Sequence, residues 1–274
     1  MKVVLAGVSD RGRVREENED HFLAGGVVEN RGALTLTLDS DGALMTDYGL
    51  LACVADGMGG YGGGAAASET ALRALAAAFY AAPRTGADAS RLAADVTAAC
   101  AHAQQAVQEL QRSDPALAGA GTTLAGVALL APRRLAVFHV GDSRVLRWSA
   151  GMLRTLTVDH TPMGAQVAAG KITETEAVGT DTTNLLTRAL GSMSAEAEVG
   201  IQTEWSPKDL FILGSDGWYG LGRGATRAAI EGRLAGGLSG TDLAGALLKD
   251  ALAADGRDNA TVVTVAFLED PAVG

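Results

Sequence analysis

The sequence predicts an α+β fold in which many β-strands pack against a few helices. Short apolar runs rich in β-branched residues recur along the whole chain, and such runs are typical of strands. The helical patterns are grouped in sequence, whereas a doubly wound α/β fold places a helix after nearly every strand. With 274 residues, 47% of them hydrophobic, the chain can bury a sizeable core, so intrinsic disorder is excluded.

The first strands are predicted at residues 3–8 and 50–55. Both are apolar runs, and the second is continuous, as in a strand buried on both faces. Between them, leucines and threonines alternate over residues 34–38, and the Asp-Ser-Asp-Gly sequence at 39–42 is typical of a turn. We therefore predict a hairpin insertion within residues 25–49.

Two helices are predicted next, because apolar residues at 71–79 and at 92–110 recur at helical spacing. Pro83 and Gly86 separate them, so we expect an antiparallel pair. A capping box from Thr173 to Glu176 predicts a short helix, and an amphipathic pattern predicts a last helix at residues 239–253. The remaining predicted strands are residues 123–130, 135–140, 145–148, 199–203, 210–213 and 261–267. No linker is evident, so residues 1–274 are expected to form one domain.

Composition excludes several classes of protein. The 32 acidic residues exceed the 22 basic ones, giving a net charge of −10, which argues against nucleic acid or an anionic membrane as the main partner. No apolar stretch is long enough for a transmembrane helix, and the N-terminal one is too short for a signal peptide. Cys53 and Cys100 are expected to be buried thiols, and the four histidines have no nearby cysteine with which to bind zinc. We expect a cytoplasmic protein.

Aspartates stand at the ends of four predicted strands: Asp56, Asp142, Asp216 and Asp258. A further acidic pair, Glu19 and Asp20, follows the first strand. One such aspartate alone is usually a turn residue or a helix cap. Several carboxylates at one sheet edge would repel each other unless cations neutralised them, and hard oxygen ligands suit Mg²⁺ or Mn²⁺.

Glycine accounts for 36 of the 274 residues, nearly twice the usual share of about 7%, and many glycines flank these aspartates. Glycine lets the backbone approach a ligand closely. The glycine-rich residues 57–64 could also be a nucleotide phosphate loop, but the Gly-Lys-Ser/Thr ending of that motif is missing. Residues 39–42 lack the full ligand spacing of a calcium loop.

Taken in order, these motifs resemble the metal-dependent serine/threonine protein phosphatases of the type 2C (PPM) family, in the form common in bacteria. The resemblance implies a four-layer α/β/β/α sandwich of two mixed or antiparallel sheets flanked by helices, with the metal centre at one end. The motifs lie at residues 9–20, 54–60, 121–123, 140–144, 159–160, 186–191, 215–217 and 258–261.

The resemblance also implies a role for each matching residue and a cofactor of two Mn²⁺ or Mg²⁺ ions. In family members the residues that correspond to Asp56, Gly57, Asp216 and Asp258 bind the two ions directly, Asp56 by bridging both and Gly57 through its carbonyl. Asp142, with Asp216, matches a third, weaker ion site, and Asp20 and, more weakly, Glu19 match residues that act through a water. Arg15 matches the arginine that grips the substrate phosphate, because its planar guanidinium suits two phosphate oxygens.

The reaction implied is attack on phosphorus by a metal-activated water, without a protein nucleophile. Met58 and Tyr61 stand where other members carry histidine, so the acid for the leaving group is not assigned. Metal-bound water is the default, and His160 is a candidate proton donor. Residues 159–184 correspond to a variable flap beside the site, where substrates could be selected.

The function expected is hydrolysis of phosphoserine and phosphothreonine in proteins, including a serine/threonine kinase and its substrates, by a monomeric enzyme. A catalytically silent module that binds phosphoproteins on the same fold is one alternative. Such modules lose metal ligands, and every expected ligand position here holds a suitable residue. A phosphatase acting on a target outside kinase signalling is the other alternative.

Overall fold

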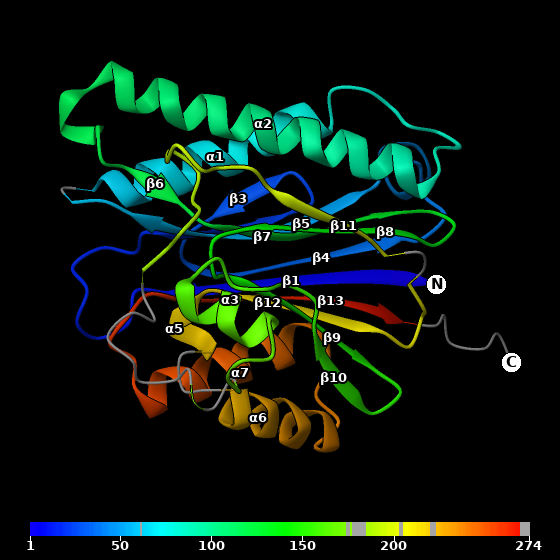
Figure 1. The fold of residues 1–274 in the computed structure, drawn as a ribbon. Coiled ribbons are helices and arrows are strands. Elements are labelled where there is room, and N and C mark those ends of the chain that lie inside the picture. The colour runs from blue at the N-terminus through cyan, green and yellow to red at the C-terminus, as the bar shows by residue number, and fades with distance from the viewer. Residues whose placement is uncertain (61, 174–175, 177–184, 203–204, 220–222, 269–274) are drawn as a thin grey trace, which may run out of the picture.

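The computed structural model of the chain describes residues 1–60, 62–173, 176, 185–202, 205–219 and 223–268. Two β-sheets lie face to face, and helices cover the outer face of each (Figure 1). Every strand pairing among the described residues is antiparallel. The predicted α/β/β/α sandwich is therefore confirmed.

One sheet has six strands, with the N-terminal strand near its edge and the C-terminal strand beside it. Its order is β10 (Met152–Thr155), β9 (Arg144–Ser149), β12 (Leu210–Gly214), β13 (Ala260–Leu268), β1 (Lys2–Asp10) and β4 (Gly32–Asp39). The register of β1 on β13 runs from Lys2 opposite Leu268 to Asp10 opposite Ala260. The first and last strands of the fold are therefore paired with each other.

The other sheet contains the strand that carries Asp56. Its order is β11 (Glu198–Gln202), β8 (Arg134–Val140), β7 (Leu124–Leu130), β5 (Leu50–Met58), β2 (Asp20–Ala24) and β3 (Val27–Glu29), and β6 (Gly121–Thr122) pairs with the end of β5. The strands β5 and β7 are buried along almost their whole length, as expected for the centre of a sandwich.

Two helical layers complete the sandwich. The antiparallel pair α1 (Gly63–Phe79) and α2 (Ala89–Ser113) covers the seven-stranded sheet, and α5 (Asp216–Tyr219), α6 (Arg223–Ala235) and α7 (Gly240–Ala254) cover the six-stranded sheet (Figure 1). Shorter elements are the π-helical turn η1 (Leu44–Tyr48), the 3₁₀ turn η2 (Pro115–Leu117) and α3 (Pro162–Ala168). No helix within the described ranges is long and apolar enough to span a membrane.

The core has three parts, one in each space between adjacent layers. Leu72, Leu92 and Phe138 belong to the part between the α1–α2 pair and its sheet. Phe22, Leu50 and Phe211 belong to the part between the two sheets, and the third part joins the six-stranded sheet to α5, α6 and α7. Each sheet thus buries both faces, which explains why apolar runs rather than strict alternation mark most of the strands.

The predicted hairpin within residues 25–49 is wrong. A turn does form at residues 39–42, where Gly42 N–H donates to Asp39 O, but β4 pairs only with β1, while β3 and β5 lie in the other sheet. The alternating leucines of β4 face the space between the sheets from an edge strand. The alternation of leucine and threonine correctly predicted a half-buried strand, but such a pattern does not indicate which strand pairs with it.

The capping box is present, since Thr173 and Glu176 exchange side-chain and backbone hydrogen bonds of 2.7–3.3 Å. The helix predicted beyond it lies outside the described residues, as do most of residues 174–184 of the predicted flap and Tyr61. The structure also contains elements that the sequence did not predict, among them the strands β2, β3 and β10 and the helix α6.

Several glycines lie inside strands under aromatic rings. A Cβ at Gly126 would lie 2.2 Å from the ring of Phe138 on the neighbouring strand, and a Cβ at Gly7 would lie 2.3 Å from the ring of Phe22. Gly214 has the same relation to Trp218, at 2.1 Å. Part of the glycine excess therefore makes room for large rings in the core and has no connection with turns.

We expect Gly126→Ala to destabilise the fold by about 1–3 kcal/mol, because the buried Phe138 ring cannot move aside without strain. Denaturant unfolding followed by circular dichroism would measure this loss. The control is Gly26→Ala, where an added Cβ meets nothing within 4 Å. Equal stability of the two variants would contradict the packing role of Gly126.

Candidate metal centre

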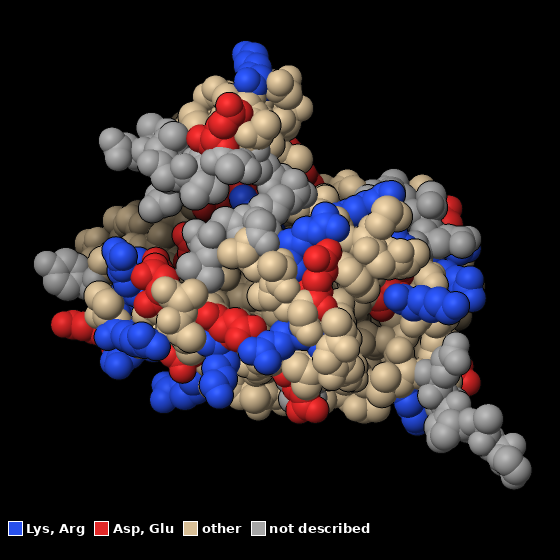
Figure 2. All heavy atoms as spheres, turned by 90° about the horizontal axis from the view of Figure 1, so that it is seen from below, with Lys and Arg blue, Asp and Glu red and all other residues tan. Residues whose placement is uncertain are grey.

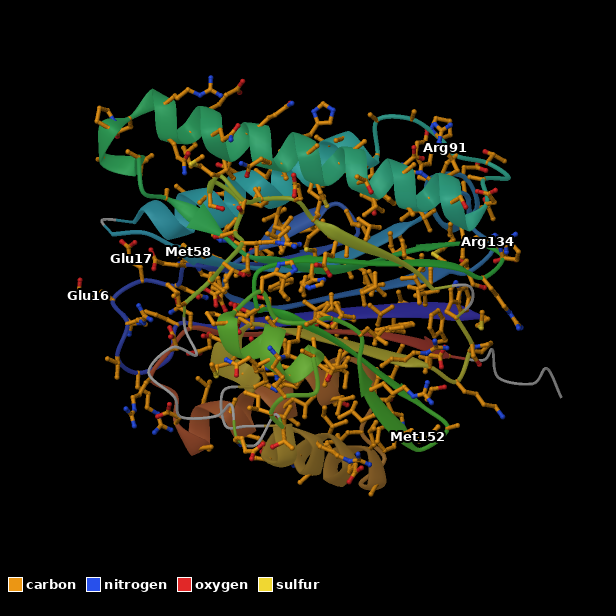
Figure 3. The ribbon with its side chains drawn as sticks, viewed as in Figure 1. Glu16, Glu17, Met58, Arg91, Arg134 and Met152 are labelled. Atoms are coloured by element: carbon orange, nitrogen blue, oxygen red, sulfur yellow. The ribbon has the colours of Figure 1, made fainter. Side chains whose placement is uncertain are left out.

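Five aspartates come from strand ends at one end of the sandwich. Asp56 lies near the end of β5, and Asp20 opposes it directly in the register of β2. Asp142 follows β8, Asp216 follows β12 and Asp258 precedes β13. Figure 3 shows Met58, at the end of β5, near Glu16 and Glu17 at this end of the molecule. The predicted convergence of the strand-end aspartates is what the topology produces.

Asp20 is fully buried beneath the others. Its Oδ2 accepts hydrogen bonds from Ser215 Oγ at 2.6 Å and from Thr261 Oγ1 at 2.8 Å, while its Oδ1 has no hydrogen-bond partner. Burial raises the pKa of Asp20 from 3.8 to about 7, the two hydroxyl donors oppose this rise, and the charges of Asp216 and Asp258 add to it. The unpartnered oxygen is what a nearby cation or its water would satisfy.

Three partly exposed aspartates repel one another beside it. Burial first, and then the charges of Asp20, Asp216 and Asp142, raise the pKa of Asp56 well above its ordinary value. Burial and the Asp216 charge raise the pKa of Asp142 to about 7. Burial and the charge of Asp258 raise the pKa of Asp216, and a contact with the Asp56 carboxyl group opposes that rise. Carboxylates this close repel one another unless a proton or a cation neutralises them.

The backbone of Asp56 is held by residues 121–123. Thr123 Oγ1 accepts from Asp56 N at 3.0 Å, and Asp56 O accepts from Thr123 N at 2.9 Å and from Thr122 Oγ1 at 2.9 Å. Next to it, a Cβ at Gly57 would lie 2.1 Å from Gly64 O and 2.6 Å from Glu19 O. Only glycine fits at position 57, which leaves its backbone close to the neighbouring carboxylates.

Glu19 lies at the N-terminus of α1, where the Gly64 N–H donates to its carboxylate. Burial raises the pKa of Glu19, and this hydrogen bond lowers it. Helix N-termini favour carboxylates because their N–H groups and dipole are positive there. Glu19 is therefore a structural partner of α1 as well as a neighbour of Asp20.

Arg15 forms an ion pair with Asp258, with 2.8 Å between Nη2 and Oδ2. The other Asp258 oxygen, Oδ1, accepts from Asn259 N at 2.8 Å. The hydrogen bond to Asp258 raises the pKa of Arg15. Both side chains are substantially exposed, at 51% and 40%, so the guanidinium lies at the solvent-exposed mouth of the aspartate cluster.

Asn259 organises the loop between β1 and β2, and the sequence analysis gave it no role. Its Nδ2 donates to Arg11 O at 2.8 Å and to Glu17 O at 3.0 Å, and its Oδ1 accepts from Glu19 N at 2.8 Å. One buried amide therefore joins Arg15, Glu19 and Asp20 to the strand that follows Asp258. Its place inside the 258–261 motif was the signal that could have found it.

The loop of Asp142 is tied to the start of the predicted flap. Arg144 binds Asp159 through two hydrogen bonds of 2.8 and 2.5 Å and lies 4.1 Å from the centre of the Tyr219 ring. The Tyr219 hydroxyl donates to the Asp142 carbonyl. These contacts fix the backbone of Asp142 while leaving its carboxylate beside Asp216.

His160 holds the same loop by its ring. Its Nδ1 accepts from Gly141 N at 3.1 Å, so the neutral ring carries its proton on Nε2, which lies 3.2 Å from Glu198 Oε1. Burial and the stacked His139 ring lower its pKa. The proton therefore points toward β11, which favours a structural role over that of a proton donor to the leaving group. The same tautomer prevents Nε2 from binding a metal in the His139–His160–Glu198 cluster.

The acidic excess of the chain is not spread evenly. On the face formed by α6 and α7, acidic and basic side chains are interspersed (Figure 2). At the strand ends, by contrast, aspartates are clustered: the charge of Arg15 lowers the pKa of Asp216 and that of Arg144 lowers the pKa of Asp142, but both pKa values remain raised. Clustered carboxylates with raised pKa values and one unpartnered buried oxygen fit hard divalent cations, so the donor set suits Mg²⁺ or Mn²⁺.

Comparison with known proteins decides the family. Residues 39–233, more than half of the chain, match the sequence profile described as Protein phosphatase 2C. The chain belongs to the protein phosphatase 2C family. The expected identification as a protein-serine/threonine phosphatase of the bacterial form is confirmed.

Curated relatives are bacterial phosphatases of this family. The chain is 30% identical over 269 residues to the Listeria innocua serine/threonine phosphatase stp, covering 94% of this chain and 93% of the relative. It is 34% identical over 212 residues to the Mycobacterium tuberculosis serine/threonine protein phosphatase PstP, covering 77% of this chain and 35% of that longer protein.

Solved structures share the whole fold. The M. tuberculosis phosphatase PstP/Ppp superposes with a TM-score of 0.77 at 28% identity, covering 98% of this chain and all of that one. A PstP catalytic domain solved in complex with two manganese ions superposes with a TM-score of 0.76 at 30% identity, with the same coverage. The protein phosphatase 2C architecture therefore extends over nearly all of the chain.

The raised pKa values make the metal-free protein sensitive to pH. Because Asp20 and Asp142 have pKa values of about 7 in the folded protein and 3.8 ordinarily, the folded state binds protons more tightly across that interval. The free energy of unfolding in EDTA should therefore decrease as pH rises through it. Each kcal/mol lost should lower Tm by about 2–4 °C.

Thermal unfolding with EDTA and with Mn²⁺ at several pH values would measure the effect. Mn²⁺ should raise Tm most at the high end of the interval, and Asp142→Asn should show a shallower decline in EDTA. A metal-free Tm that rises steadily over the interval would contradict the proposed electrostatics.

Proposed function

We propose that this phosphatase hydrolyses phosphoserine and phosphothreonine in proteins with two Mn²⁺ or Mg²⁺ ions. The observation that supports this most is the group of aspartates with raised pKa values around the unpartnered oxygen of Asp20. The direct ligands we propose are the carboxylates of Asp56, Asp216 and Asp258 and the carbonyl of Gly57. Asp142 with Asp216 is proposed to hold a third, weaker ion, and Asp20 and Glu19 to act through water.

Bound ions would supply two things: a water acidified enough to attack phosphorus, and neutralisation of the phosphoryl charge. The chain's own residues supply orientation. Arg15 at the mouth of the site can exchange its ion pair with Asp258 for two phosphate oxygens, because its planar fork matches both acceptors. Asn259 and Ser215 keep Glu19 and Asp20 in place during this exchange.

A protein nucleophile is not supported by the described side chains nearby. Both cysteines are buried free thiols, and burial raises the pKa of Cys100 to about 12 and that of Cys53 well above its usual value. Such thiols are not ionised at neutral pH. The Ser215 hydroxyl is buried and donates to Asp20. Water is therefore the nucleophile we propose.

We propose phosphorylated proteins as substrates, among them a serine/threonine kinase and the proteins it modifies, because the curated relatives are serine/threonine phosphatases. The buried, unpaired cysteines fit a reducing compartment, so we also propose a cytoplasmic location. The alternative of a catalytically silent binding module has no support from the ligand positions, each of which keeps a suitable group.

Activity should depend on divalent cations and on the aspartates. We expect turnover of para-nitrophenyl phosphate and of a phosphothreonine peptide with Mn²⁺ and none with EDTA. Asp216→Asn should reduce kcat by at least about 100-fold, since it removes a proposed ligand of the ions that would neutralise the phosphoryl charge. Asp41→Asn, on an exposed turn, is the control with the same chemical change. A well-folded protein without Mn²⁺-dependent turnover would refute the proposed function.

Arg15→Ala should mainly raise KM, by about tenfold or more, if the guanidinium binds phosphate equally in the ground and transition states. Steady-state kinetics would separate KM from kcat, and Arg15→Lys should recover part of the loss because it restores charge without the fork. Unchanged KM and kcat in Arg15→Ala would remove Arg15 from the site.

A further inference from the structure

A groove of about 620 Å³ runs between α1 and α2 on the outer surface of their layer. Alanines make up much of its lining, among them Ala74, Ala77 and Ala78 of α1. Figure 1 shows that the outward side of α2 faces away from both sheets. The wall contributed by α2 has eight residues. Six of them follow one another at alternating intervals of four and three residues, Arg91, Asp95, Ala98, His102, Gln105 and Glu109, and the other two are Ala99 and Ala106. That spacing is the spacing of a coiled-coil seam.

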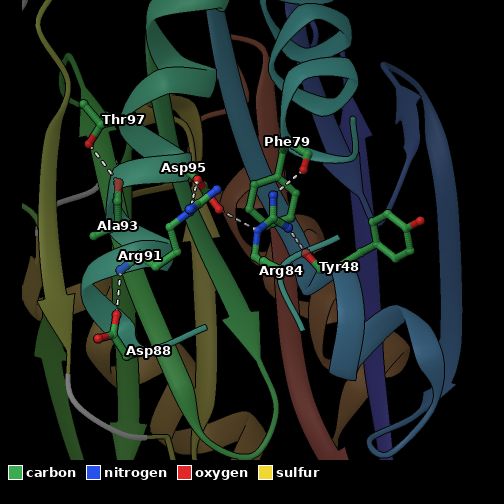
Figure 4. A network of polar contacts seen from close by, with 8 residues as sticks. All are labelled: Tyr48, Phe79, Arg84, Asp88, Arg91, Ala93, Asp95 and Thr97. Atoms are coloured by element: carbon green, nitrogen blue, oxygen red, sulfur yellow. Dashed lines mark hydrogen bonds and ion pairs between the residues drawn. The ribbon is translucent and has the colours of Figure 1, made fainter. Parts of the chain in front are cut away.

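The first turns of α2 present charges in a fixed arrangement. The Asp95 carboxylate accepts from Arg84 Nε at 3.1 Å and from Arg91 Nε at 2.8 Å (Figure 4). Arg84 is buried and also bonds the carbonyls of Tyr48 and Phe79. Arg91 is 66% exposed, so its other N–H groups can reach a partner.

The far end of the same wall carries the opposite charge. Glu109 is exposed and has no ion pair within the part of the chain that the structure describes. Arg112, about one turn later, has none there either, and its Nε donates to the Gln108 carbonyl. The seam is thus basic at Arg91 and acidic at Glu109. A helix running in the opposite direction would meet it with complementary charge if it had the same pattern.

The seam of α2 itself has that pattern. Reversal of the helix about Cys100 brings the six side chains of this spacing opposite one another, and the outer pairs have opposite charge. Reversal pairs Arg91 with Glu109, Asp95 with Gln105 and Ala98 with His102, and the next positions on the seam, Asp88 and Arg112, also have opposite charge. Shifting the register by one turn in either direction loses the Arg91–Glu109 pair.

We propose that the α1–α2 groove is the interface of a twofold dimer, in which α2 of one copy lies antiparallel to α2 of a second copy of this chain. The interface would be isologous, as in most soluble homodimers. The small side chains at its centre allow close approach of the two helices. It replaces the monomer expected from the sequence and is independent of the proposed catalytic function. The interface lies on the outer surface of the helical layer, facing away from both sheets (Figure 1), so both candidate metal centres stay open.

Sedimentation velocity of the full chain, up to about 100 µM, where even a weak interface associates, tests this dimer. The wild-type chain should dimerise, less so at high salt. Glu109→Arg removes both Arg91–Glu109 pairs and adds repulsion, so the dissociation constant should rise at least about tenfold. Ala98→Trp should also prevent association by blocking close approach. The double variant Arg91→Glu with Glu109→Arg should restore the dimer because it recreates both pairs.

Glu231→Arg on α6 is the matched control, since it changes the charge of an exposed helical glutamate in the opposite layer, and it should leave association unchanged. Circular dichroism and phosphatase activity would confirm folding of each variant. A chain that stays monomeric at the highest concentration overturns the proposal, even if another protein binds the groove. A dimer unaffected by Glu109→Arg and Ala98→Trp, or not restored by the double variant, overturns this interface.

Discussion

Mutual repulsion among carboxylates at one end of the sandwich is the constraint on which the rest of the structure depends. Three of the aspartates are held by neutral partners: hydroxyl groups bind Asp20, the Thr122 and Thr123 hydroxyls and the Thr123 amide bind the Asp56 backbone, and the Tyr219 hydroxyl binds the Asp142 loop. These contacts fix the donors while leaving their charge for a cation. The sheets supply the rigidity, because long antiparallel pairings keep the strand ends in register.

The position of the aspartates could be predicted because each one directly follows or precedes an apolar run, and strand ends meet at the edge of a sheet. The family motifs added which groups act together. Asn259 shows where this reasoning stops. Its three hydrogen bonds reach residues more than 200 positions away in sequence, and a single side chain gives no local pattern that reports such contacts.

The fold likewise has features that the local sequence predicts and features that it does not. Strand existence follows from local apolarity, so β1, β5, β7, β8, β12 and β13 were predictable. Strand partners depend on the whole sandwich, and β4 therefore joined β1 across the space where a hairpin had been expected. The strand glycines also escaped prediction, since Gly126 and Gly7 are explained only by the rings of Phe138 and Phe22 that lie over them.

The Arg15–Asp258 pair has a thermodynamic consequence for how the site fills. In the metal-free protein, Oδ2 of Asp258 is engaged by the guanidinium and Oδ1 by the Asn259 amide. On the proposed function, a cation at Asp258 and a phosphate at Arg15 would each weaken the same ion pair. Linkage would then be reciprocal: if one ligand raises the affinity of the other by some factor, the second raises the affinity of the first by the same factor. Arg15 would thus occupy the place of the cation in the metal-free site, and each ligand would favour binding of the other by displacing it.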